Sequence, residues 1–324
     1  MLLGGLILFV ALVREIGAPV VVDNVRTVGW GIVLIVAQEI LAYSANTMGW
    51  WCAFPAPRPS LRFTQLLATR IAGDAINYVT PTATIGGEFV RVRVLRGHGV
   101  TTSVVASVAI AKLSQTVGQI AFIVIGLLVV LPSVPLPGAL RHGLFAGVAV
   151  LAAGALALLV MQRRGLFAPT LAALARLGLP QLAPNLRARL ERLDGEIARF
   201  YATSGPQFAQ SSLWFFVGWT LGVLEVALIL FFLQIPVTFE RALAIEVLSA
   251  TIDGVLFFVP GKVGTQEGGK VLIFSLLGLD AAKGLSLGIL RRIRELTWAG
   301  IGLLILSRRQ ATPRAVADPA TSQS

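Results

Sequence analysis

The hydrophobic positions of this chain gather into long runs that short polar stretches separate. A helix needs about 20 apolar residues to cross a bilayer, and five runs reach that length or come close to it. They lie at 28–54, 102–131, 143–161, 212–233 and 281–307. A shorter apolar run before Arg14 is the expected sixth span. The pattern therefore predicts an all-α polytopic membrane protein with about six full spans.

Two further apolar regions, about 62–97 and 240–279, are interrupted near their middles by proline and glycine. Because proline ends or kinks a helix, each region offers two half-length helices instead of one span. Broken helices are tolerated at membrane depth where protein or a water-filled cavity receives the freed backbone groups. We therefore predict two re-entrant hairpins in addition to the full spans.

The two broken regions carry the same polar residues at the same spacing. One offset of 179 residues relates every matched pair, and it continues without a gap into the following span. A doubled set of this kind is typical of an internal repeat, which many transporters contain. We assign the repeats to 28–131 and 207–310. The matched pairs include Asp74 with Asp253, Pro81 with Pro260, Glu88 with Glu267, and Lys112 with Arg291.

Basic residues indicate which loops face the cytoplasm. Segment 162–211 holds seven arginines, and the tail after the last run holds Arg308, Arg309 and Arg314. The positive-inside rule places both segments, and with them the N-terminus, in the cytoplasm. The other loops agree only if each broken region returns to the side from which it enters. We therefore predict inverted repeats in the inner membrane of a bacterium, with hairpins that enter from opposite faces.

The segment between the repeats contains one clear helical periodicity. An amphipathic helix is predicted by apolar residues at alternating spacings of four and three, namely Leu186, Leu190, Leu193, Ile197 and Phe200. Its apolar face suits the inner-leaflet interface and the helical bundle equally well. Residues 311–324 are polar, and we expect them to form a disordered tail.

Composition supports the membrane interpretation. The 324 residues are 56% hydrophobic and 13% charged, whereas soluble domains carry about 25% charged residues. The net charge of +11 follows from the positive-inside rule, so we predict no nucleic-acid partner. Cys52 is the single cysteine, which excludes an internal disulfide. His98 and His142 fall in loops on opposite sides, and we predict no metal site and no cofactor.

The repeated residues place charge deep in the membrane. Lys112 lies about ten residues into its span, or ~15 Å deep, which is half of the ~30 Å hydrocarbon core. Arg291 lies about as deep from the other face. A cation at this depth costs about 3 kcal/mol and needs a carboxylate partner or an anionic ligand. The possible partners are Asp74, Glu88, Asp253, Glu267, Glu295, Glu39 and Glu225. Helix capping by the Asp and Glu residues is the purely structural alternative.

Three functions fit this pattern of buried charges. The first is the binding and movement of an anionic lipid, whose headgroup meets Lys112, Arg291 and the half-helix N-termini. The others are a proton-coupled transporter of small solutes and a membrane enzyme or accessory subunit that modifies a lipid. The sequence contains neither a Ser-His-Asp set nor a Walker A motif, so we predict a protein that is not an enzyme. The expected substrate-binding residues are Asp74, Asn77, Pro81, Gly86, Gly87, Glu88, Arg91, Lys112, Asp253, Pro260, Gly264, Glu267, Arg291, Arg294 and Glu295.

The first broken region reads GDAIN at 73–77, then Pro81, GGE at 86–88 and Arg91. With these motifs the chain resembles the lysylphosphatidylglycerol synthase transmembrane family, whose members are also called flippase-like domain proteins. The stretch 260–267, PGKVGTQE, is similar to the C-terminal Pro-Gly…Gly…Glu motif of that family. Within the family, the likeness is greatest to the hopanoid-biosynthesis-associated branch.

The resemblance implies a domain that translocates or binds a lipid. It implies an anionic phospholipid, a polyprenyl lipid or a hopanoid-type lipid as the partner. Full synthases also carry a soluble aminoacyl-transfer domain, for which this sequence has no counterpart. We therefore expect the activity of the membrane domain and not lipid synthesis.

Overall fold

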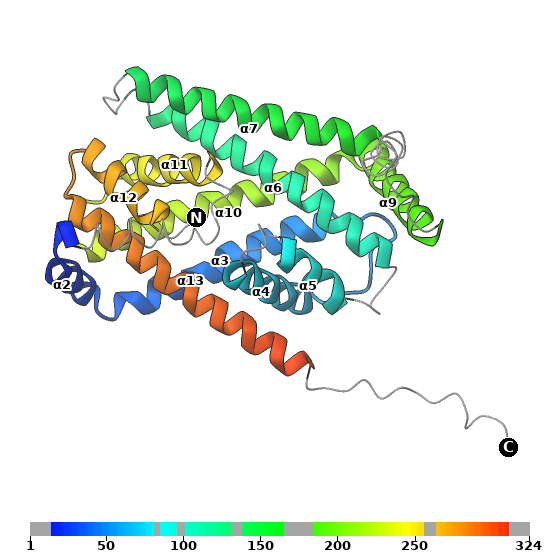
Figure 1. Ribbon diagram of the computed structural model, residues 1–324, viewed down its shortest axis with the longest axis horizontal. Helices are drawn as coiled ribbons and strands as arrows, with labels where there is room; N and C mark the ends of the chain where they lie inside the picture. The colour runs from blue at the N-terminus through cyan, green and yellow to red at the C-terminus, as the bar shows by residue number, and fades with distance from the viewer. Residues whose placement is uncertain are drawn as a thin grey trace.

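The structure, a computed structural model, describes residues 14–80, 85–95, 101–130, 132, 138–164, 184–255 and 264–310. Every regular element in these ranges is an α-helix (Figure 1), which confirms the predicted all-α polytopic class. The helices are α2 (Ala18–Val28), α3 (Gly31–Cys52), α4 (Phe63–Val79), α5 (Ile85–Leu95), α6 (Thr101–Val130), α7 (Gly138–Arg164), α9 (Pro184–Thr203), α10 (Gly205–Phe232), α11 (Phe239–Val255), α12 (Thr265–Leu276) and α13 (Ala281–Gln310).

Three of the described helices are long and apolar enough to cross a membrane, namely α3, Thr102–Val130 of α6, and α10. The 30-residue α13 is also long enough, at about 1.5 Å per residue. Its apolar character is lower because Arg291, Arg292, Arg294 and Glu295 fall near its middle. The expected span before Arg14 lies outside the described residues.

The two broken regions form pairs of short helices, as their proline and glycine pattern predicted. Helices α4 and α11 have 17 residues each, and their partners α5 and α12 have 11 and 12. All four are shorter than the ~20 residues of a full span. Pro81 and Pro260, the expected helix breakers, lie at 81–84 and 256–263, which are outside the described residues.

The helices follow the same order in both predicted repeats, with one long helix, a short pair and a second long helix. We call α3–α6 the first helix run and α10–α13 the second. The first short helix of each run packs on the last helix of the other run, so that α4 contacts α13 and α11 contacts α6. The first long helices, α3 and α10, pack on each other. This exchange is the arrangement that a pseudo-two-fold axis produces. The opposite entry of the two hairpins stays a prediction.

Apolar side chains fill two cores within the bundle. One core lies between α10, α11 and α12 and includes Ile229, Val247 and Phe274. The other includes Trp50 and Leu113 from α3 and α6. These cores hold together helices that are far apart in the sequence. Burial of apolar area stabilises a contact between two helices whatever their separation along the chain.

The amphipathic helix α9 packs on the bundle. Leu193, Ile197 and Phe200 are buried in the second core, and α9 contacts both α6 and α7. The periodicity had left the inner-leaflet interface and the bundle as equal alternatives. The three-dimensional structure decides for the bundle, since the apolar stripe already has a protein partner there.

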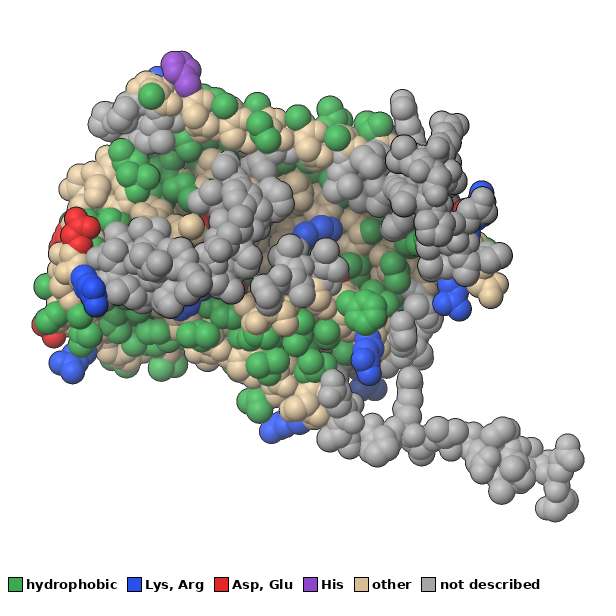
Figure 2. Space-filling view, viewed as in Figure 1, with side chains coloured by type: hydrophobic (Ala, Val, Ile, Leu, Met, Phe, Trp, Pro, Cys, Tyr) green, Lys and Arg blue, Asp and Glu red, His purple; other side chains and the backbone are tan. Residues whose placement is uncertain are grey.

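Large apolar side chains also cover the outer faces of the long helices. Figure 2 shows hydrophobic side chains spread along the upper and lower edges of the molecule, with Lys and Arg side chains near its two ends and at the lower right. Exposed apolar area on this scale is typical of a surface that faces lipid. Examples are Leu128, Val150, Leu156, Leu213 and Phe231.

Candidate functional site

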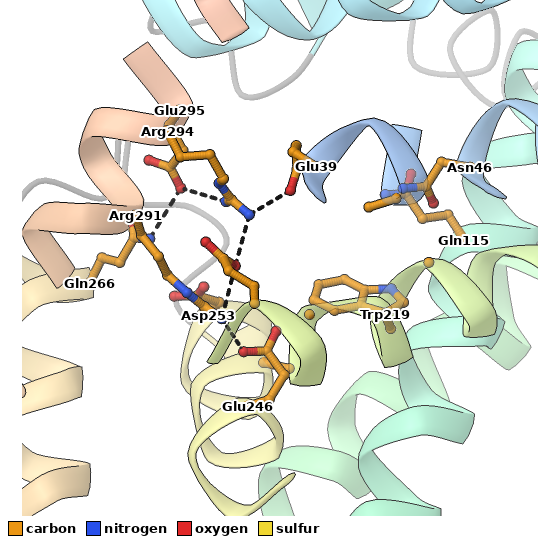
Figure 3. Close-up of a pocket in the computed structure, with 15 residues that line it drawn as sticks. Glu39, Asn46, Gln115, Trp219, Glu246, Asp253, Gln266, Arg291, Arg294 and Glu295 are labelled. Carbon is orange, nitrogen blue, oxygen red and sulfur yellow. Dashed lines mark hydrogen bonds and ion pairs between the residues drawn. The ribbon is translucent and has the colours of Figure 1, made fainter. Parts of the chain in front are cut away.

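A polar cavity of about 210 Å³ lies where the two helix runs meet (Figure 3). Side chains from α3, α6, α10, α11, α12 and α13 line it. Charged groups dominate this lining, although the surrounding helices are apolar. They are Glu39, Glu225, Glu246, Asp253, Glu295, Arg291 and Arg294.

Repeat-related positions from both runs reach the same cavity. The offset of 179 residues pairs three positions of the first run with three of the second. All six side chains or backbones line the cavity, so the site belongs to both runs. These pairs are Glu39 with Gly218, Asn46 with Glu225, and Gln115 with Arg294.

Two arginines of α13 hold three carboxylates in a continuous chain. Arg291 Nη2 donates to Glu246 Oε2 and lies 3.2 Å from Glu225 Oε2. Arg294 Nη1 donates to Glu225 Oε2 at 2.8 Å and to Glu39 Oε2 at 2.6 Å. The spacing of three residues puts both guanidinium groups on one helix face, as the sequence predicted. Glu225 therefore bridges the two arginines.

Arg292 connects the hairpin of the second run to the hairpin of the first. Its Nη2 donates to Glu267 Oε1 at 2.8 Å, and its Nη1 donates to the Tyr78 hydroxyl at 3.0 Å. Glu267 also accepts the Gly264 backbone N–H at 2.8 Å, so this carboxylate both caps α12 and binds an arginine. Sequence reasoning did not include Arg292 or Tyr78, because their contact joins residues 214 positions apart.

Replacing Tyr78 by phenylalanine removes one hydrogen bond to a half-buried charged group. We expect the free energy of unfolding to fall by about 1.5 kcal/mol, the lower end for bonds to charged groups. Thermal unfolding of the purified protein in detergent measures this loss. Tyr43→Phe is the matched control, since the Tyr43 ring packs on Trp298 and its hydroxyl makes no hydrogen bond within the described ranges. Equal effects of the two substitutions would contradict the role of the Tyr78 hydroxyl.

The first hairpin holds a separate network of charges. Arg91 donates from Nη2 to Asp74 Oδ1 at 2.5 Å and from Nη1 to Glu88 Oε2 at 2.7 Å. Arg70 Nε lies 3.8 Å from Asp74 Oδ2. Asp74, Glu88 and Arg91 were all predicted as site residues, and the structure brings them together. Arg70 was missed, although its position one turn before Asp74 is a signal for an ion pair.

Asn77 and Gly87 join the two helices of this hairpin. The Gly87 backbone N–H donates to Asn77 Oδ1 at 2.7 Å. A Cβ built on Gly87 would overlap the carbonyl oxygen of Gly73, so glycine permits close approach of α5 to α4. Gly86 and Gly87 both lie in the first turn of α5, and not in the break between the two short helices.

Lys112 and Arg291 do not line the same cavity, contrary to the expectation from the repeat. The Lys112 side chain is exposed, and its charge interacts with Glu88 and Asp74 of the first network. Arg291 is 5% exposed and pairs with Glu225 and Glu246. The two cations therefore belong to different networks, because α6 presents Gln115 to the cavity instead.

Glu295 lies one helical turn after Arg291, a spacing that permits an ion pair between them. In the structure it contacts other residues instead. It accepts from Gln266 Nε2 at 3.1 Å and lies 3.6 Å from Arg292 and 3.8 Å from Arg294. Asp253 lines the cavity, as Figure 3 shows. Glu246 was missed, although it lies two helical turns before Asp253 on the same face.

The described residues contain no group of three or more His, Cys, Asp or Glu side chains with the arrangement of a metal site. A comparison with curated proteins and a comparison with solved structures each found no match. A comparison with protein families matched residues 1–303 to the family described as "Lysylphosphatidylglycerol synthase TM region". The match spans both helix runs and every residue of the site. The chain therefore belongs to the lysylphosphatidylglycerol synthase TM region family of membrane proteins.

Proposed function

We propose that this protein is a lipid flippase that moves an amphiphilic lipid across the inner membrane of a bacterium, with both termini in the cytoplasm. The family supports a lipid-related, flippase-like function in a membrane. The observation that carries the proposal is the charged cavity lined by both helix runs. A site at the junction of two repeats can face either leaflet when one repeat rocks against the other.

The size and lining of the cavity suit a lipid headgroup. Its volume of about 210 Å³ accommodates a polar headgroup but not two acyl chains. The apolar outer faces of helices such as α7 and α10 leave the acyl chains in the bilayer. In this mechanism the polar side chains of the cavity replace the water that the headgroup loses, while the acyl chains remain in the apolar interior of the bilayer.

The charges of the two networks favour different headgroups. Five carboxylates and two guanidinium groups line the cavity, which favours a positively charged group such as the amine in the lipid of the family name. An anionic headgroup, which Lys112 and Arg291 predicted, instead finds surplus positive charge at the first network. There Arg70, Arg91 and Lys112 accompany Asp74 and Glu88.

Purified protein in liposomes tests the proposal with fluorescent lipids that carry anionic, zwitterionic or cationic headgroups. We expect at least one lipid to change leaflets faster than in protein-free vesicles, as measured by chemical quenching of the outer leaflet. Ala42→Leu fills the cavity and should slow this movement about tenfold, which corresponds to about 1.4 kcal/mol in the barrier. Ala153→Leu on the exposed face of α7 is the control and should leave the rate unchanged.

The same vesicles distinguish the alternative functions. A new lipid species in extracts of the vesicles would indicate a membrane enzyme and contradict a pure flippase. Uptake of a small solute that is indifferent to the lipid composition would indicate a solute transporter. Folded protein that moves none of the three lipids would refute the proposal.

A further inference from the structure

The cavity contains more buried carboxylates than its arginines can neutralise. Glu39, Glu225 and Glu246, here called the glutamate triad, share Arg291 and Arg294. If all three glutamates were ionised, the chain of ion pairs would carry one uncompensated negative charge. An isolated charge in a protein interior is costly, and buried groups commonly avoid this cost by binding a proton.

The surroundings of the triad do not supply the missing positive charge. The triad lies on α3, α10 and α11, and the other charged side chains that line the cavity are Asp253 from α11 and Glu295 from α13. Helices α6 and α12 contribute the amides of Gln115 and Gln266, and the buried Lys270 of α12 does not line the cavity. Helices α2 and α9 also pack on α10, but none of their described side chains lines the cavity. Both additional charges are therefore acidic.

The third arginine of α13 is already engaged with two other carboxylates. Arg292 lies 2.8 Å from Glu267 and 3.6 Å from Glu295. Arg292 is therefore not available to neutralise the surplus charge of the triad. The imbalance follows from the described side chains themselves and not from one ambiguous contact.

The first network provides an internal comparison with the opposite balance. Two carboxylates, Asp74 and Glu88, face two guanidinium groups, Arg70 and Arg91. Lys112 adds a further positive charge to this network. Of these two networks of described charges, only the one at the cavity carries surplus carboxylates.

One atom of the triad has an unfilled hydrogen-bonding position at the cavity. Glu225 is 1% exposed, and its Oε1 is buried without a hydrogen-bond partner among the described residues. Its Oε2 contacts both arginines. A proton can therefore bind Oε1 without breaking either ion pair. An unpartnered buried oxygen in a cavity-lining carboxylate points to a ligand that binds there.

We propose that the glutamate triad binds one exchangeable proton and that this proton drives lipid movement through the cavity. The second half of the inference rests on the proposed flippase function, whereas the proton site stands without it. Loss of the proton leaves a carboxylate that attracts a positively charged headgroup, and the proton passes to water in the accessible compartment. Return of a proton to Oε1 neutralises the carboxylate and releases the headgroup. The proton and the positively charged headgroup thus occupy the triad in turn.

Infrared difference spectroscopy of the purified protein tests the proton site directly. Buried carboxyl groups titrate as high as about pH 8–9, so we choose a range from about pH 5 to pH 10. We expect the carbonyl band of a protonated carboxylic acid to disappear across this range in the natural protein. Glu225→Gln should lack the titrating band, because two carboxylates then balance two arginines. Glu240→Gln, at an exposed position of α11, should keep it.

Glu39→Gln provides a second variant in case Glu225→Gln does not fold. Its side chain is 20% exposed, and among the described residues Arg294 is its ion-pair partner, so its replacement disturbs the chain of ion pairs less. It restores the same balance of two carboxylates and two arginines and should also lack the band. A natural protein without a titrating band, or variants that both retain it, would overturn the proton site.

Lipid movement in vesicles with an imposed pH gradient tests the coupling. With the membrane potential clamped, we expect reversal of the gradient to change the net rate about tenfold in the natural protein, a difference of about 1.4 kcal/mol. In Glu39→Gln the rate should be the same for both gradients. Replacing Na⁺ by K⁺ in the buffers should have no effect, and a requirement for Na⁺ would overturn the assignment of a proton.

The experiments distinguish failure of the proton site, failure of its coupling to lipid movement and failure of the flippase function. A titrating band together with movement that ignores the pH gradient would overturn the coupling and leave the flippase function intact. A titrating band without movement of any lipid would refute the flippase function and the coupling, while the proton site would stand.

Discussion

Arg291→Ala is expected to lower the free energy of unfolding by about 3–5 kcal/mol, the range for removal of one partner from a buried ion pair. The arginine is 5% exposed and holds Glu225 and Glu246. Without it, Glu246 loses its arginine partner and Glu225 keeps Arg294 alone. Unfolding of the purified protein in detergent, by heat and by denaturant, measures the loss.

Two further variants show whether unpaired charge causes this loss. Arg291→Ala combined with Glu246→Gln should recover part of the stability, because the carboxylate that lost its arginine partner is removed. Arg26→Ala is the control for loss of an arginine, since the Arg26 side chain is 78% exposed. It should change the stability by less than about 1 kcal/mol, as for other exposed ion pairs. If the double variant were less stable than Arg291→Ala, the electrostatic explanation would be wrong.

Gly87→Ala is expected to cost about 3 kcal/mol or more, the upper end for overpacking of a well-packed interior. The added Cβ would overlap the Gly73 carbonyl oxygen and would lie 2.5 Å from the Asn77 side chain. Backbone atoms cannot turn aside as a flexible side chain can. Helix α5 must therefore move away from α4, which weakens the hydrogen bond between Asn77 and Gly87 and the ion pair between Arg91 and Asp74.

Gly154→Ala is the matched control for the glycine substitution. Gly154 lies within α7, and a Cβ at this position meets no atom within 4 Å. Alanine is the better helix former by about 1 kcal/mol, so this variant should be as stable as the natural protein or slightly more stable. The melting temperatures of both variants, measured in the same detergent, provide the comparison. Similar melting temperatures would show that the close approach of α4 and α5 does not depend on glycine.

Local pattern was sufficient to find the helices and most of the first network. The apolar runs and their breaks predicted α3, α6 and α10 and both hairpins, because hydrophobicity and proline act within a few residues of where they occur. Asp74, Glu88 and Arg91 were found because the first hairpin contains all three of them. Their contacts are therefore contacts between near neighbours in sequence.

The second network was found only in part. The repeat identified Arg291 and Glu267, and Glu39 and Glu225 were recognised as possible partners. Glu246 was missed. Lys112 was expected to share a site with Arg291, but its charge interacts with Glu88 and Asp74, which were among its possible partners. A shared offset indicates related places in two repeats, but it does not state which side chains meet across the junction.

The sequence by itself determined the membrane class, the order of the helices and the presence of buried charge, and it predicted the internal duplication. Each of these depends on composition or on spacing along one segment. Only the tertiary structure decided which charges pair and how the cavity is balanced. Arg291 meets Glu246 across 45 residues, and Arg294 meets Glu39 across 255. Such pairs depend on how whole helices pack, which is set by the sum of many apolar contacts and not by any local pattern.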